Sequence, residues 1–159
     1  MSFDIEPLWL SFKLATVTTA CLLLIGIPFS YWLAFTRSKI KFLFEAFVSL
    51  PLVLPPSVLG FYLLVAFAPD SFLGNALNQL FDISLVFTFG GMVIASIIYS
   101  FPFMVQPIQG ALENLPRSLT EASYTLGKTR WQTLRYVLLP NIKPALLTGT
   151  VLSFAHTVG

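Results

Sequence analysis

The chain contains three long runs without a charged residue, and these runs constrain its fold more than any other feature. They comprise residues 14–36, 46–69 and 83–112, which are 23, 24 and 30 positions long. An α-helix rises about 1.5 Å per residue, so about 20 residues cross a hydrocarbon layer of roughly 30 Å. Only 10% of the chain is charged, whereas soluble domains are about one quarter charged. The runs therefore predict membrane-spanning helices.

We expect an all-α, polytopic transmembrane helix bundle. Three full spans are predicted at about 8–35, 42–68 and 83–109. A fourth apolar stretch, 144–159, has 16 residues and stops inside its apolar pattern. This predicts a truncated fourth span and a chain that is incomplete at its C-terminus. Residues 1–159 are expected to form a single transmembrane domain.

The basic residues predict how the bundle is oriented. Eight of the nine Lys and Arg residues lie in the two segments that follow the first and third spans. Basic residues near span ends mark the cytoplasmic side. The N-terminus is therefore expected outside and the segment 112–143 in the cytoplasm. Glu45, near the inner end of the second span, is expected to reach the lipid headgroups. On the outer side we expect Lys13 and four acids, Asp4, Glu6, Asp70 and Asp82.

The second predicted span contains a proline cluster at membrane depth. Pro51, Pro55 and Pro56 are followed by Ser57. Proline lacks a backbone N–H, so the freed carbonyls must face other helices or water rather than lipid. Two interpretations stay open: a kink required for packing, and the lining of a transport pathway by Pro51, Pro55, Pro56 and Ser57.

The polar segment 112–143 is predicted to form two short helices. The first begins at Pro116 and ends at Gly127, where a left-handed cap is expected. Thr129 is a suitable N-cap for the second helix, which is expected to run to Pro140. A helical pair of this size is suited to filling a groove on a partner protein. On the second helix, one apolar face is expected at Trp131, Leu134 and Leu138.

The same segment resembles a motif of permease subunits of ABC importers. That motif reads Glu-Ala-Ala, three residues, Gly, nine residues, Ile, any residue, Leu-Pro. Two positions of this sequence depart conservatively from it, Ser123 for the second Ala and Val137 for Ile. The positions that match are Glu121, Ala122, Gly127, Leu139 and Pro140.

The resemblance covers essentially the whole chain. Three further segments resemble the molybdate permease subfamily specifically. They are "SLPLVLPPSVLGFYLLVAF", "ISLVFTFGGMVIAS" and "VLSFAHTVG". The resemblance implies a non-enzymatic subunit of a bacterial or archaeal inner-membrane importer that forms the pathway for molybdate. In such an importer, the two short helices dock into a cleft of a separate ATPase subunit. Glu121 would pair with a basic group there, and Gly127 would allow the turn.

The resemblance also implies the partners. They are the ATP-binding subunit, which would hold ATP and Mg, a second copy of the permease, an outside oxyanion-binding protein and membrane lipid. No cofactor is expected in this chain, and no nucleic acid.

Two alternatives remain at this stage. Within transport, the permease could serve a sulfate, thiosulfate or tungstate importer, because these oxyanions are similar in shape and charge. From another class, the chain could be a non-transport membrane-bound subunit or an assembly factor. An enzyme would need polar groups that converge inside the bundle, whereas the spans offer scattered hydroxyls, Gln106, Gln109 and His156. We interpret His156 as a buried, hydrogen-bonded structural residue, and we expect no catalytic residues and no metal site.

Overall fold

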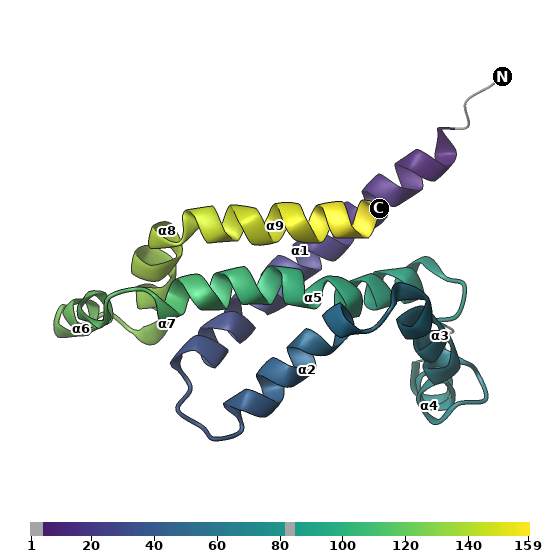
Figure 1. Ribbon diagram of the computed structural model, residues 1–159, viewed down its shortest axis with the longest axis horizontal. Helices are drawn as coiled ribbons and strands as arrows, with labels where there is room; N and C mark the ends of the chain where they lie inside the picture. Colours follow the sequence, from purple (N-terminus) through teal and green to yellow (C-terminus); the bar gives the residue numbers. More distant parts are fainter. Residues whose placement is uncertain (1–4, 82–84) are drawn as a thin grey trace.

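The computed structural model describes residues 5–81 and 85–159, and every regular element in these two ranges is a helix (Figure 1). The predicted all-α class is confirmed. Asp4, Asp82 and the first two residues of the predicted span 83–109 lie outside the described residues. The elements are α1 (Glu6–Phe35), α2 (Lys41–Val53), α3 (Pro56–Phe67), α4 (Phe72–Phe81), α5 (Phe89–Glu113), α6 (Arg117–Thr125), α7 (Arg130–Thr133), the π-helical η1 (Leu134–Leu138), α8 (Leu139–Asn141) and α9 (Lys143–Val158).

Three helices, α1, α5 and α9, pack against one another and form the body of the molecule. In the described ranges, α1 and α5 alone are long and apolar enough to cross a membrane as single helices. The count rises to four when each of two bent pairs is taken as one span. One pair is α2 with α3, where the chain bends by 112°. The other is Arg130–Asn141 with α9, where it bends by 81°. Figure 1 shows α6 and α7 at the end of the bundle opposite α3 and α4.

One hydrophobic core runs from the bundle into the segment between α5 and α9. Leu22 of α1 packs with Met104, Ile108 and Leu112 of α5. The same cluster includes buried residues of the polar segment. The helical pair, α6 and the helical stretch from α7 to α8, is therefore packed against the bundle. The buried residues of the polar segment are Leu134, Leu138 and Ile142.

Two glycines let α1 and α9 approach α5 closely at Met104. A Cβ atom added to Gly26 would lie 2.9 Å from Met104 Cγ. One added to Gly149 would lie 3.2 Å from the Met104 carbonyl oxygen and 3.3 Å from its Sδ. Small residues at such crossings allow membrane helices to pack backbone against side chain.

Gly149→Val should therefore destabilise the bundle by about 1–3 kcal/mol, because the added methyl groups overpack the crossing with α5. The matched control is Gly110→Val, since a Cβ at Gly110 meets nothing within 4 Å while the helix-propensity cost is the same. Thermal unfolding of the purified protein in detergent measures the difference. Equal melting temperatures for the two variants would contradict the close crossing.

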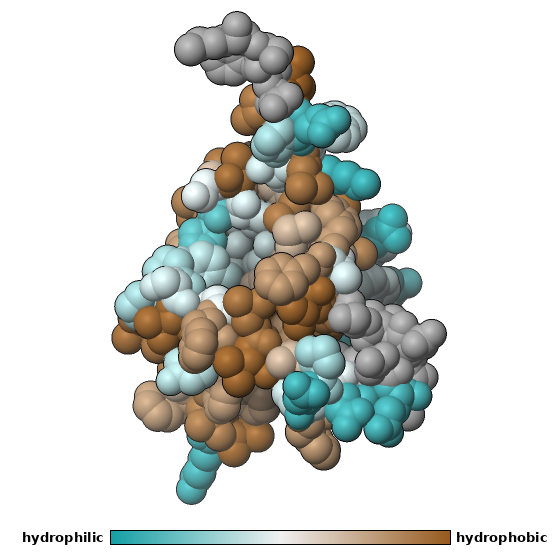
Figure 2. Space-filling model, turned by 90° about the vertical axis from the view of Figure 1, so that its right-hand side faces the viewer, coloured by the Kyte–Doolittle hydropathy of each residue, from teal (hydrophilic) through white to brown (hydrophobic). Residues whose placement is uncertain are grey.

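Many large apolar side chains remain on the outside of the bundle. Phe42 is 77% exposed, Val53 79% and Leu24 75%. Figure 2, seen from the end that carries α3 and α4, shows apolar residues over much of that face, with polar residues in separate patches. Soluble monomers rarely expose contiguous apolar surface on this scale, so lipid or neighbouring helices cover it.

Candidate coupling surface and pathway

Gly127 makes the turn between α6 and α7 in a left-handed conformation. Its φ is +75°, which side chains other than glycine rarely adopt. The N–H of Lys128 donates to the Ser123 carbonyl at 3.1 Å, and the N–H of Gly127 donates to the Tyr124 carbonyl at 2.9 Å. These two bonds are those of a Schellman motif, and the predicted left-handed cap is confirmed.

Side-chain hydrogen bonds hold the two helices in one arrangement. Thr129 and Gln132 form a capping box at the start of α7. The hydroxyls of Ser123 and Thr133 lie 2.8 Å apart and are both buried. Ser123 stands where the permease motif has its second alanine, so this departure adds a polar contact between α6 and α7.

Pro140 changes the geometry of the second helix. It has no N–H to donate to the carbonyl of Tyr136, four residues earlier. The helix takes up a π turn just before it, and the N–H of Leu139 donates to the Leu134 carbonyl, five residues back. The polar segment thus remains helical from Arg130 to Asn141 before it bends into α9.

The predicted coupling residues divide into an exposed and an internal group. Glu121 forms no ion pair with a described residue, so its carboxylate is available to a partner. Ser123 is buried, whereas Val137 and Leu139 are half-buried. The exposed members are Glu121, Ala122, Gly127 and Pro140.

Four large side chains on the helical pair are exposed, and the sequence alone does not predict them as contacts to a partner. Leu126 is 78% exposed, Trp131 62%, Tyr136 61% and Tyr124 44%. With Glu121 they make up what we call the docking surface. Of the three residues expected on one apolar face of the second helix, Leu134 and Leu138 are buried, whereas Trp131 is exposed.

A ladder of polar side chains joins α2 to α5 near the same end of the bundle. Gln109 donates to Glu45 at 2.7 Å and to Glu113 at 2.9 Å. Lys41 lies 2.7 Å from Glu113 and 3.6 Å from Glu45. Gln109, which is buried, thus ties the Glu45 carboxylate to α5, and the expected reach of Glu45 to the lipid headgroups stays a prediction.

The proline cluster lies at the bend between α2 and α3. Leu54 and Pro55 are extended there, and the missing N–H groups of Pro55 and Pro56 free the carbonyls of Pro51 and Leu52 from helical hydrogen bonding. Of the predicted pathway residues, Pro51 is buried, and Pro55, Pro56 and Ser57 are exposed.

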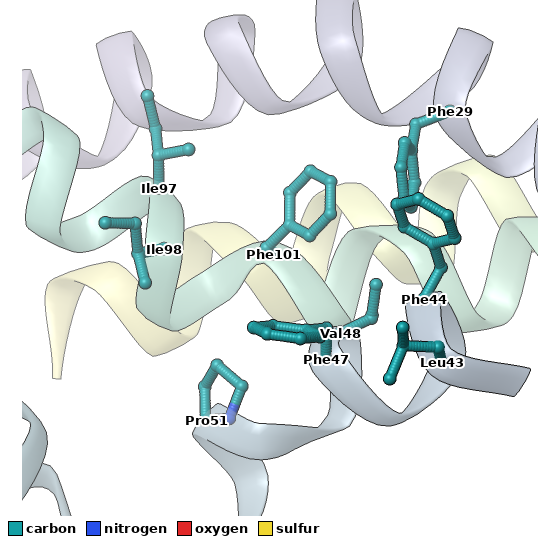
Figure 3. Close-up of a pocket in the computed structure, with 9 residues that line it drawn as sticks. All are labelled: Phe29, Leu43, Phe44, Phe47, Val48, Pro51, Ile97, Ile98 and Phe101. Atoms are coloured by element: carbon teal, nitrogen blue, oxygen red, sulfur yellow. The ribbon is translucent and has the colours of Figure 1, made fainter. Parts of the chain in front are cut away.

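Two cavities adjoin this part of α2, and they differ in chemistry. The first, about 540 Å³ in volume, is shown in Figure 3 and offers an anion neither donors nor cations. The second, about 280 Å³, lies at the bend and is reached by His156 of α9 and by Tyr99 and Phe103 of α5. The residues around the first cavity are Phe29, Leu43, Phe44, Phe47, Val48, Pro51, Ile97, Ile98 and Phe101.

The sequence from Gly26 onward matches a known family. Residues 26–159 fit the family described as "Binding-protein-dependent transport system inner membrane component". The chain belongs to this family of ABC importer permeases. The predicted resemblance is thereby confirmed, and the multi-pass membrane character agrees with the apolar helices.

Several relatives of this permease carry names that state a substrate. A protein of Azotobacter vinelandii named "Molybdenum transport system permease protein ModB" is 46% identical over 156 residues, covering 98% of this chain and 69% of the relative. The protein of the same name in Escherichia coli K12 is 35% identical and covers 97% and 69%. A "Sulfate transport system permease protein CysT" from the same organism is 37% identical over 134 residues, covering 84% and 48%.

The family motif marks only part of the surface that this permease exposes. It includes the turn glycine and Glu121, but not Leu126, Trp131 or Tyr136. Their signal in the sequence is large apolar side chains within a polar segment, which indicates a partner only after the structure shows them exposed. The sequence indicates His156 only as a lone histidine in an apolar helix, and the fold alone brings it to its hydrogen-bond partner Ser100, 56 residues away in the sequence.

Proposed function

We propose that this permease is the membrane-spanning subunit of an ATP-driven molybdate importer and is coupled to a separate ATPase subunit. The observation that carries the proposal is the docking surface, a set of exposed large side chains on a polar helical pair whose inner side belongs to the bundle core. Exposed Trp and Tyr side chains of this kind dominate binding at protein interfaces.

The coupling follows from how the helical pair is attached. The docking surface would sit in a cleft of the ATPase subunit, with Glu121 beside a basic group there. Leu134 and Leu138 pack in the same cluster as Ile108 and Leu112, so a displacement of the pair by the ATPase displaces α5. Two sites joined through packed elements in this way can share a coupling free energy.

The topology in the proposal is the one that the basic residues favour. The N-terminus lies outside and residues 112–143 lie in the cytoplasm, where the ATPase subunit binds ATP and Mg. A second copy of the permease completes the pathway within the lipid bilayer, and an outside binding protein delivers the oxyanion. The spans are proposed at 8–35, 42–68, 83–109 and 144–159, the second one bent at the prolines.

The oxyanion pathway is proposed to pass the bend between α2 and α3, along Pro51, Pro55, Pro56 and Ser57. Support comes from the cavity at this bend, which His156 lines. The larger apolar cavity in Figure 3 is unsuitable, because a dianion buried without donors or counter-charges is strongly unfavourable.

Molybdate is proposed over sulfate, thiosulfate and tungstate because of the relatives' names and identities. The full-length importer, reconstituted with its ATPase subunit and binding protein in liposomes, should take up labelled molybdate when ATP is supplied inside the liposome, where the docking surface faces. A tenfold excess of unlabelled sulfate should leave this uptake nearly unchanged. Uptake of labelled sulfate alone would overturn the substrate, and failure of the ATPase subunit to co-purify would overturn the coupling.

A further inference from the structure

His156 is held in a defined orientation at the wall of the cavity beside the proline bend. Its ring lies against those of Tyr99 and Phe103, with centroid distances of 4.3 and 4.2 Å. Its Nδ1 atom is 3.0 Å from Ser100 Oγ. The residue is half-buried and lines the cavity together with Pro51–Pro56, so the expectation of a buried structural histidine is only partly correct.

The hydrogen bonds around His156 form a chain in which each hydroxyl proton is used once. Thr157 Oγ1 donates to the Ser153 carbonyl at 2.8 Å, so it accepts from Ser100 Oγ, at 3.1 Å. Ser100 has then used its only proton, and its oxygen accepts from Nδ1 of His156. The neutral imidazole thus carries its proton on Nδ1, and Nε2 is an acceptor.

Nε2 is the free end of this chain. It makes no hydrogen bond to a described residue. It is also not among the buried side-chain atoms without a partner in the described ranges, which are hydroxyls of Thr18, Thr19 and Ser153, so Nε2 is accessible. The cavity that His156 lines is the one at the bend.

The histidine and the bend lie at similar depth. His156 is thirteen residues after Lys143 at the start of α9, and Val53 is twelve residues after Lys41 at the start of α2. At 1.5 Å per residue, each lies about 20 Å along its helix from the basic end, well within a hydrocarbon layer of roughly 30 Å. A polar group at such depth generally faces a cavity and serves function.

We propose that Nε2 of His156 contacts the transported oxyanion at the proline bend, through a proton that the neutral tautomer lacks. This inference rests on the proposed function. The added proton comes from water and lies between Nε2 and an oxyanion oxygen, as imidazolium with the dianion or as imidazole with the singly protonated anion. Without that proton, two acceptors would face each other, so oxyanion and proton bind the bend together.

The proposal predicts a pH dependence with a definite sign. The contact binds one proton more than the empty site does, so lower pH favours it across the range in which histidine titrates. His156 is the only histidine of the chain. Tyr99 of α5 is the titratable group that lies against its ring, and the cavity residues Pro51–Pro56 of the α2–α3 bend include none.

The test compares molybdate uptake at pH 6 and pH 8 by the full-length importer in liposomes, with both sides at the same pH. Wild type should be roughly tenfold faster at pH 6, the size of one charge-assisted hydrogen bond. His156→Asn, whose amide can replace Nδ1–H but not Nε2, should melt at the wild-type temperature and lose this ratio. Tyr99→Phe, the control for the neighbouring phenol, should retain it.

A second variant keeps the proposal testable if the first one misfolds. Ser100→Ala removes the acceptor that fixes the tautomer, so the neutral ring can carry its proton on Nε2. Uptake at pH 8 should then rise towards the value at pH 6. An unchanged pH ratio in either variant would overturn the role of Nε2 alone, whereas a wild-type importer that takes up no molybdate would overturn the proposed function and this inference together.

Discussion

Trp131→Ala should weaken the binding of the ATPase subunit by at least about 30-fold and reduce ATP-driven uptake accordingly. Trp131 is 62% exposed on the docking surface, and truncation of a central Trp at an interface typically costs 2 kcal/mol or more, which corresponds to that factor. The fold should persist, since the buried side of the same helix is formed by Thr133, Leu134 and Leu138. Titration of the detergent-purified permease with the ATPase subunit measures the affinity.

Trp9→Ala is the matched control for this variant. Trp9 is 71% exposed and lies near the start of α1, whereas the docking surface adjoins the opposite end of that helix (Figure 1). Its replacement removes the same side chain and should leave ATPase binding unchanged. Equal affinities of the two variants would show that the helical pair is not where the ATPase binds.

Gly127→Val should leave membrane insertion intact and lower ATP-driven uptake by about tenfold. A Cβ at this position meets nothing within 4 Å, so the effect arises from the backbone, whose φ is +75°. A left-handed conformation costs an ordinary residue about 1–2 kcal/mol, and more when the side chain is β-branched. The turn would open, and the orientation of α6 and its C-cap Leu126 relative to α7, which carries Trp131, would change. Uptake and ATP hydrolysis, measured on the same liposomes, report the loss of coupling.

Gly127→Asn separates the turn from the mere presence of a side chain. Asparagine is tolerated in the left-handed region and is the usual alternative to glycine in this cap. This variant should retain most of the uptake. Normal coupling in Gly127→Val would contradict a need for the left-handed turn, and a complete loss in Gly127→Asn would point to a steric rather than a conformational requirement.

The bundle was largely predictable from the sequence because charged side chains are excluded from hydrocarbon over about 20 residues at a time. Proline positions also indicated where the second apolar run would break. The angle of 112° between α2 and α3 could not be predicted, because it depends on packing against α5. Glu45 shows the same limit, since its partner Gln109 is 64 residues away in the sequence.

The turn of the helical pair was predictable and its surfaces were not. Glycine at one fixed position between two helices defines the cap through local backbone chemistry alone. Periodicity placed Trp131 with Leu134 and Leu138, but periodicity indicates only which residues share a face. Whether a residue of that face is buried depends on tertiary contacts. Thr133 is in contact with Ser123 of α6, whereas Trp131 remains exposed.

The most direct test of the account locates the helical pair relative to the membrane. Cys21 is the only cysteine, so Cys21→Ala provides a background for single cysteines at two exposed positions, Arg130→Cys in α7 and Asn75→Cys in α4. A membrane-impermeant thiol reagent should label the Asn75 variant in intact cells and the Arg130 variant only after permeabilisation. Labelling of both variants in intact cells would place the helical pair outside and contradict its proposed docking to an ATPase.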